Sequence, residues 1–196
     1  MTVRSVGWAI EDGGGEDWAT VQLDAERLTA TGVASAREPE PYTLTYDLET
    51  GPGFVTEQLR VEARGSGWVR TLDLRRAADG SWTARSGDGA SAEALPHLAG
   101  ALDCDLGRCP ATNSMPVLRE GLLERDGTVD FVMAWVSVPD LTVHRSGQRY
   151  TTLGTDPDGR RRIRYASLES DFASDLTFDA DGLVVDYPQL ARRLPS

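Results

Sequence analysis

Residues 42–49 read Tyr-Thr-Leu-Thr-Tyr-Asp-Leu-Glu, and this stretch decides the fold class. Every second position is apolar, and the positions between them are polar. Because successive side chains of a strand point to opposite faces, this alternation predicts a strand with one face in the core and the other in water. Similar alternation recurs in residues 59–64, 68–74 and 163–167. The chain is therefore expected to be all-β.

Asp-Gly dipeptides separate many of these runs, and such dipeptides supply the positive φ angles of two-residue hairpin turns. They occur at residues 79–80, 126–127, 158–159 and 181–182. About a dozen strands of ordinary length would fit between such turns. Helix is expected only as one or two short turns, within residues 91–99 and 188–193. Strands connected in this way form an antiparallel meander, which folds as a sandwich or a barrel.

Length and charge limit the number of domains and the kinds of partner that the chain is expected to have. A chain of 196 residues is expected to form one domain, residues 1–196. Its net charge of −11 argues against nucleic acid and anionic membrane surfaces as partners. All basic residues are Arg, which excludes mechanisms that need a Schiff-base or P-loop lysine. No apolar run resembles a signal peptide or a membrane helix, so we expect a cytoplasmic location without integral membrane insertion.

One segment, residues 102–119, breaks the β rhythm with two prolines, a glycine and an asparagine. Functional groups tend to lie on such irregular loops, so this segment is the first place to look for a site. Within it Cys104 is expected to face inward, while Asp103 and Asp105 face water or cap the loop. The spacing of Cys104 and Cys109 does not match a zinc site, so free thiols are expected and no metal or other cofactor.

Catalytic signatures are weak. The only histidines are His97 and His144, and no Gly-x-Ser-x-Gly motif occurs. His144 falls at a position of its run that is expected to face solvent. Residues 156–159 and 179–182 resemble fragments of a calcium loop, but each lacks the remaining ligands and lies where a turn is expected. No catalytic residue is therefore predicted.

The segment around Asn113 contains the motif Asp105-Leu106-x-x-x-Pro110-x-Thr112-Asn113-x-x-Pro116-Val117-x-Arg119. This motif resembles the hallmark of the bacterial putative glycolipid-binding family, long catalogued as a domain of unknown function. The C-terminal part agrees in Gln148-Arg149-Tyr150, Arg164-Tyr165, Asp181-Gly182-Leu183-Val184-x-Asp186-Tyr187-Pro188 and Arg192-Arg193. The resemblance spans nearly the whole chain in consistent order.

The family implies a meander that closes into a spindle-like barrel, similar to periplasmic lipoprotein carriers, and a role in holding a glycolipid or lipid. On this hypothesis inward residues line an apolar cavity, while Asn113 and Arg119 at its mouth hydrogen-bond a polar head. The lining residues are expected to include Trp68, Met115, Phe131, Met133, Trp135 and Tyr165.

Two alternatives stay open. The first is an enzyme acting on a lipid or sugar, with Asp103, Asp105 or Asp171 as an acid or base. It requires a buried carboxyl beside an open pocket. The second is a protein-interaction domain with a filled core, which could self-associate through a sheet edge. The sequence names neither a ligand nor an oligomeric state.

Overall fold

The computed structural model describes residues 1–38, 40–87 and 91–195. Its main feature is one large sheet, which is accompanied by one short α-helix and three 3-10 turns. The strands are β1 (Thr2–Ile10), β2 (Gly15–Leu23), β3 (Leu28–Ala36), β4 (Tyr42–Thr50), β5 (Thr56–Gly65), β6 (Trp68–Arg76), β7 (Trp82–Ser86), β8 (Glu93–Ala94), β9 (Asp103–Leu106), β10 (Thr128–Val136), β11 (Val143–Thr155), β12 (Arg161–Ser167), β13 (Ala173–Phe178), β14 (Val184–Tyr187) and β15 (Ala191–Arg193). The helical pieces are α1 (Ser114–Arg119), η1 (Pro52–Phe54), η2 (Pro96–Leu98) and η3 (Pro110–Asn113).

The sheet is a meander in two halves, which are joined where the first strand pairs with the last, β1 with β15. Its order runs from β8 down to β1, then β15 down to β9. Neighbours are antiparallel, as predicted, except that β9 lies parallel to β10. The all-β class and the antiparallel meander are therefore confirmed.

The predicted closure into a barrel is wrong, because the sheet stays open between β8 and β9. The end of the sheet at β9 curls toward β5, where the Thr56 amide donates to the Leu102 carbonyl at 3.0 Å. However, β5 pairs with β4 on one side and, from Gln58 onward, with β6 on the other. Only the first residues of β5 are left for β9, so this contact does not extend into a ladder, and β6 to β8 continue past it.

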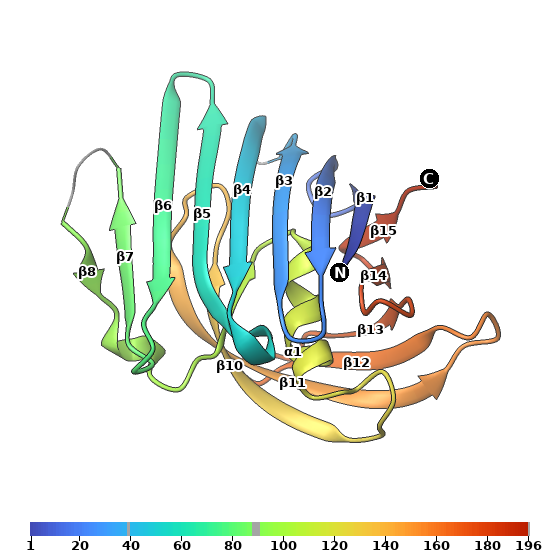
Figure 1. The fold of residues 1–196 in the computed structure, drawn as a ribbon. Helices are drawn as coiled ribbons and strands as arrows, with labels where there is room; N and C mark the ends of the chain where they lie inside the picture. The colour runs from blue at the N-terminus through green and yellow to red at the C-terminus, as the bar shows by residue number, and fades with distance from the viewer. Residues whose placement is uncertain (39, 88–90, 196) are drawn as a thin grey trace.

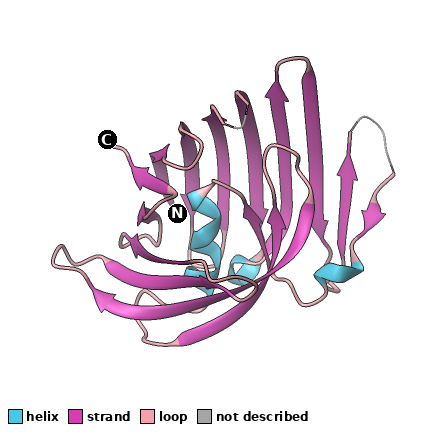
Figure 2. Cartoon of the chain, turned by 180° about the vertical axis from the view of Figure 1, so that it is seen from behind, coloured by secondary structure: helices cyan, strands magenta, loops and turns pink. Residues whose placement is uncertain are grey.

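Curvature brings the two halves face to face. Figure 1 shows β1 to β7 as a wall of upright strands, with β10 to β12 sweeping across it, and α1 lies between them. Figure 2 shows the same arrangement from behind. A twisted sheet of this length curls in this way, and its two inner faces share one core.

The predicted alternation in β4 is confirmed. Its polar residues Thr43, Thr45 and Asp47 are exposed, while the apolar residues between them are buried. On the inner face, a Cβ atom at Gly32 would overlap the Tyr46 ring, so glycine lets that ring lie flat on β3. The interior is occupied by large side chains that are almost fully inaccessible, among them Trp8, Trp82, Tyr46, Tyr150, Phe178, Leu28, Leu48, Leu59, Leu74, Leu98, Leu106 and Met115.

The Asp-Gly hairpins use three-residue loops instead of the two-residue turns expected. At the β6–β7 loop the Ala77 amide donates to the Ser81 carbonyl, and the Gly80 amide donates to the Ala77 carbonyl. Gly80 has a φ of 86°, which an L side chain rarely adopts. The same two bonds recur around Gly159 and Gly182. This is a type I turn closed by a glycine in the left-handed region. Residues 126–127, by contrast, lie in the connection between α1 and β10.

Residues 102–119 are more regular than the expected irregular loop, since they form β9, η3 and α1. The proline at 116 falls in the first turn of α1, where amide groups have no helical partner, so it does not prevent the helix. The expected helical turn at 91–99 is split into β8 and η2, and β15 follows the turn at 188–190. No helix in the described ranges is long and apolar enough to cross a membrane.

Candidate functional site

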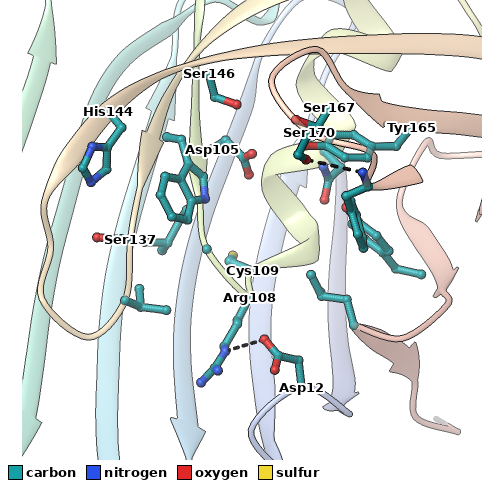
Figure 3. A pocket seen from close by; sticks show the side chains of 18 of the residues that line it. Asp12, Asp105, Arg108, Cys109, Ser137, His144, Ser146, Tyr165, Ser167 and Ser170 are labelled. Carbon is teal, nitrogen blue, oxygen red and sulfur yellow. Dashed lines mark hydrogen bonds and ion pairs between the residues drawn. The ribbon is translucent and has the colours of Figure 1, made fainter. Parts of the chain in front are cut away.

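A pocket of about 770 Å³ opens between the β10–β11 hairpin, the loop after β12 and the segment that follows β9. Figure 3 shows His144 and Ser137 on one side of it, Tyr165, Ser167 and Ser170 on the other, and Asp105 between them. The pocket is lined by Asp12, Asp105, Leu106, Gly107, Arg108, Cys109, Asn113, Trp135, Ser137, Val138, His144, Arg145, Ser146, Tyr165, Ser167, Glu169, Ser170, Phe172, Tyr187 and Leu190.

The carboxylate of Asp105, on β9, is part of the pocket lining. The Gln148 amide nitrogen donates to its Oδ2 at 2.6 Å, and the Thr112 hydroxyl shares its proton between the Asp105 Oδ1 at 3.3 Å and the Cys109 carbonyl at 2.8 Å. Burial raises the pKa of Asp105, although these two hydrogen bonds act in the opposite direction. No basic side chain in the described part of the chain forms an ion pair with it. Asp105 is thus a desolvated acceptor that faces an open pocket.

Asn113 belongs to the same hydrogen-bond network as Asp105 and also lines the pocket. Its Nδ2 donates to the Tyr150 hydroxyl at 2.9 Å, and that hydroxyl donates to Gln148 Oε1 at 3.5 Å. Gln148 is 1% exposed and therefore cannot turn away without losing these partners. The network holds Asp105 and Asn113 in fixed positions at the floor of the pocket.

Aromatic rings form the walls. Trp135 lies 5.4 Å from the His144 ring and keeps 37% of its surface exposed. Across the pocket, Tyr165 makes edge contact with Phe172 at 5.8 Å and lies 6.1 Å from Tyr187. Aromatic faces of this kind can cover the apolar faces of a ligand while its polar edges reach hydrogen-bond partners.

The guanidinium of Arg108 is held at the rim. It donates to Asp12 at 3.1 Å, to the Glu38 carbonyl at 3.0 Å and to the Tyr42 hydroxyl at 3.5 Å. This arrangement ties the segment after β9 to the loops of the first half of the sheet. Arg108 is therefore largely occupied by protein partners.

Behind the floor lies a buried group of Asp17, Tyr46 and Cys109. The Tyr46 hydroxyl donates to Asp17 at 3.1 Å, and Asp17 is 0% exposed. Burial raises the pKa of Asp17 to about 7 and raises the pKa of the Cys109 thiol. Cys109 is free, as expected, and so is Cys104. A thiol with a raised pKa is a poor nucleophile. Cys109, which also lines the pocket, is therefore interpreted as a structural residue of its wall.

Three of the predicted ligand-binding residues line this pocket, namely Asn113, Trp135 and Tyr165. The remaining five lie elsewhere. Met115, Met133 and Phe131 are core residues with exposures of 0%, 2% and 8%. Trp68 lies under the Arg70 guanidinium, whose carbon is 4.0 Å from the ring centre. Arg119 donates to both carboxylate oxygens of Asp103, at 2.5 and 2.6 Å.

Asp103 differs from the expectation that it faces water, since its side chain is 1% exposed and paired with Arg119. Of the three acids considered for catalysis, only Asp105 faces the pocket. Asp171 is exposed in the loop before β13. Within the described ranges no group of three or more His, Cys, Asp or Glu side chains could hold a metal ion.

Sequence reasoning did not single out Ser137, Ser146, Ser167 or Glu169, which also line the pocket. They come from separate strands and loops, and no local pattern distinguishes them from other surface residues. The signal that did exist was the motif containing Asp105 and Asn113.

A second groove of about 620 Å³ lies at the other end of the sheet, beside the β6–β7 loop. Trp82, Leu95 and Pro96 provide much of its apolar lining, and Arg76 lies at its edge. Trp82 itself is nearly buried, and its indole donates to the Ala101 carbonyl at 3.1 Å. This groove lacks the buried acceptors found at the first pocket.

Comparison with known proteins identifies solved structures of similar fold and one family. The crystal structure of a DUF1089 family protein from Pseudomonas aeruginosa is similar, with a TM-score of 0.72 and 30% identity over 91% of this chain and 92% of that chain. A β-barrel-like DUF1849 protein from Brucella abortus has a TM-score of 0.53 at 8% identity, over 97% of this chain and 96% of that one, which shows a shared fold alone. No curated protein matches the sequence. A family model described as Putative glycolipid-binding matches residues 5–193, and the chain therefore belongs to that family.

Proposed function

We propose that the protein binds a sugar-headed lipid in the open pocket between β9, β10 and β12, without transforming it. The observation that carries the proposal is the mixed lining of a pocket of about 770 Å³, which lies within the usual range for small-molecule sites. Buried oxygen acceptors at its floor suit a sugar, and its walls and mouth carry apolar side chains. The family description is in keeping with this role.

The sugar would sit over Asp105 and Asn113, between the Trp135 and Tyr165 rings. The alkyl chain would leave the pocket along Val138, Phe172 and Leu190, where little directional bonding is needed. Burial of apolar surface contributes about 25 cal/mol per Å², so even a short chain adds appreciable affinity. Of the ligand-binding residues expected from sequence, the proposal keeps Asn113, Trp135 and Tyr165.

Dodecyl maltoside, used below its critical micelle concentration, is a suitable probe because it combines a neutral sugar with one alkyl chain. Isothermal titration should give saturable binding to one site. Trp135→Ala should weaken it about tenfold, which corresponds to about 1.4 kcal/mol. Trp18→Ala is the matched control, because Trp18 is 50% exposed on β2 and does not line this pocket.

Unsaturable or absent binding would refute the proposal, as would equal losses in the Trp135 and Trp18 variants. Equal losses would mean that the probe coats exposed apolar surface without entering the pocket.

A second candidate, an enzyme that uses Asp105 as an acid or base, is favoured by one observation. Asp105 has a raised pKa and lines an open pocket, which general acid–base catalysis requires. Chromatography of dodecyl maltoside after prolonged incubation distinguishes the two. Release of sugar that is lost in Asp105→Asn supports an enzyme, and an unchanged probe supports a binding protein.

A further inference from the structure

The polar groups at the floor of the pocket offer a ligand hydrogen-bond acceptors. Oδ2 of Asp105 already accepts a bond from Gln148, while Oδ1 shares the single proton of the Thr112 hydroxyl with the Cys109 carbonyl. A carboxylate oxygen has two lone pairs, so each can accept one bond more. Asp105 therefore presents acceptors to a ligand.

Asn113 adds a further acceptor. Its Nδ2 donates to the Tyr150 hydroxyl at 2.9 Å, which directs the amide nitrogen toward the protein. The remaining atom of that amide is the carbonyl oxygen, on a side chain that lines the pocket. Two acceptor groups, joined through Tyr150 and Gln148, thus belong to the pocket lining.

The basic residues of the lining lie elsewhere. His144 and Arg145 are exposed on β11, on the Trp135 side of the pocket, as the position of His144 in Figure 3 illustrates. Arg108 is engaged at the rim by Asp12 and its other partners. None of these three residues forms an ion pair with the carboxylate of Asp105.

A buried acceptor that loses water and gains no donor is costly, at about 1–3 kcal/mol. A ligand whose head group carries only acceptors, such as an ether chain, would leave Asp105 and Asn113 unpaired. A head group with adjacent hydroxyls would supply donors to both. Sites built on such groups discriminate strongly against analogues that lack the donor.

We infer that Asp105 and Asn113 make this pocket selective for head groups that donate hydrogen bonds, with Asp105 as the specificity-determining residue. The ligand class is a lipid whose head group is rich in hydrogen-bond donors such as hydroxyls. This inference rests on the proposed function, because it concerns the same pocket, but it makes a separate claim about selectivity.

The test compares two probes with the same dodecyl chain. One is dodecyl maltoside, and the other is a dodecyl polyoxyethylene ether with a methylated end, whose neutral head offers acceptors only. Titration calorimetry on the full chain should show at least about tenfold tighter binding of the maltoside, since one unpaired acceptor costs about that much.

Asp105→Asn keeps the shape of the side chain but replaces one acceptor by a donor, so the preference for the maltoside should fall about tenfold. Asp171→Asn is the matched control, because it removes one carboxylate from an exposed position outside the pocket. The control should keep the full preference. The wild-type comparison needs no variant, so it stays decisive even if Asp105→Asn folds poorly.

Equal binding of the two probes to the wild-type protein would overturn this inference while leaving lipid binding in place. An unchanged preference in Asp105→Asn would overturn the role of Asp105. Failure of both probes to bind would instead refute the proposed function.

Discussion

Replacing Asp17 by Asn should change how the stability of the protein depends on pH. The Asp17 carboxyl lies behind the pocket wall, 0% exposed, with the Tyr46 hydroxyl 3.1 Å from its Oδ1. Burial is the main reason that its pKa rises from 3.8 to about 7. Asn has the same shape and can accept the same hydrogen bond, but it does not ionise. The substitution therefore removes the titration and leaves the packing.

The sign follows from proton binding. Between pH 3.8 and about 7, folded Asp17 is protonated while the unfolded chain has released that proton. The free energy of unfolding of the wild-type protein therefore falls as pH rises, and the loss is complete above about pH 7. The two pKa values differ by about 3, and each unit corresponds to about 1.4 kcal/mol, so the full effect is about 4 kcal/mol.

Urea unfolding at pH values from 4 to 8, followed by tryptophan fluorescence, measures this effect. The free energy of unfolding of Asp17→Asn, minus that of the wild type, should rise by about 4 kcal/mol across this range. Any fixed cost of burying the amide changes the level of this difference but not its slope. Asp47→Asn, on the exposed face of β4, controls for loss of one negative charge. A difference that stays constant with pH would refute the desolvation of Asp17.

Further outcomes follow from the same reasoning. Arg119→Met should destabilise the protein by about 3–5 kcal/mol in urea unfolding, because it leaves Asp103 buried without its partner. Arg149→Met, at an exposed ion pair, should have a far smaller effect. Equal effects of the two substitutions would contradict the burial argument. Met115→Ala should cost about 2–5 kcal/mol in the same assay, since the side chain is 0% exposed, and a neutral result would mean that the interior is loose there. Gly159→Ala should cost about 1 kcal/mol, seen as a lower melting temperature, because its φ of 82° disfavours a side chain although nothing crowds the position.

The strand pattern was predictable because it depends on local physics. In residues 42–49, each apolar side chain that alternation placed in the core is buried, and each polar one is exposed. A half-buried strand needs only its own period of two to make this visible.

Closure of the sheet was not predictable in the same way. It depends on whether the strand at the end of the sheet finds a free edge, and β9 meets β5 where β6 already occupies all but its first residues. Alternation also failed for Asp103, because β9 is buried on both faces. Its carboxylate is instead satisfied by Arg119, from a helix that two prolines had argued against.

The candidate site was partly visible in the sequence. The motif that contains Asp105 and Asn113 located the floor, and inward parity identified Tyr165. The expectation of a hollow interior led instead to Met115 and Met133, which are buried in the core. The pocket lies between the β10–β11 hairpin, the loop after β12 and the segment after β9. Its side chains come from segments far apart in the sequence, and the pattern of a single sequence does not show which distant segments meet.

The five tryptophans allow a direct test of which surface holds the ligand. Each indole N–H gives one signal in a proton–nitrogen correlation spectrum, and Trp135 lines the proposed pocket while Trp82 lines the second groove. Titration with dodecyl maltoside should shift the Trp135 signal and leave those of Trp8 and Trp82 in place. A shift of Trp82 without one of Trp135 would contradict the account and move the ligand to the other end of the sheet.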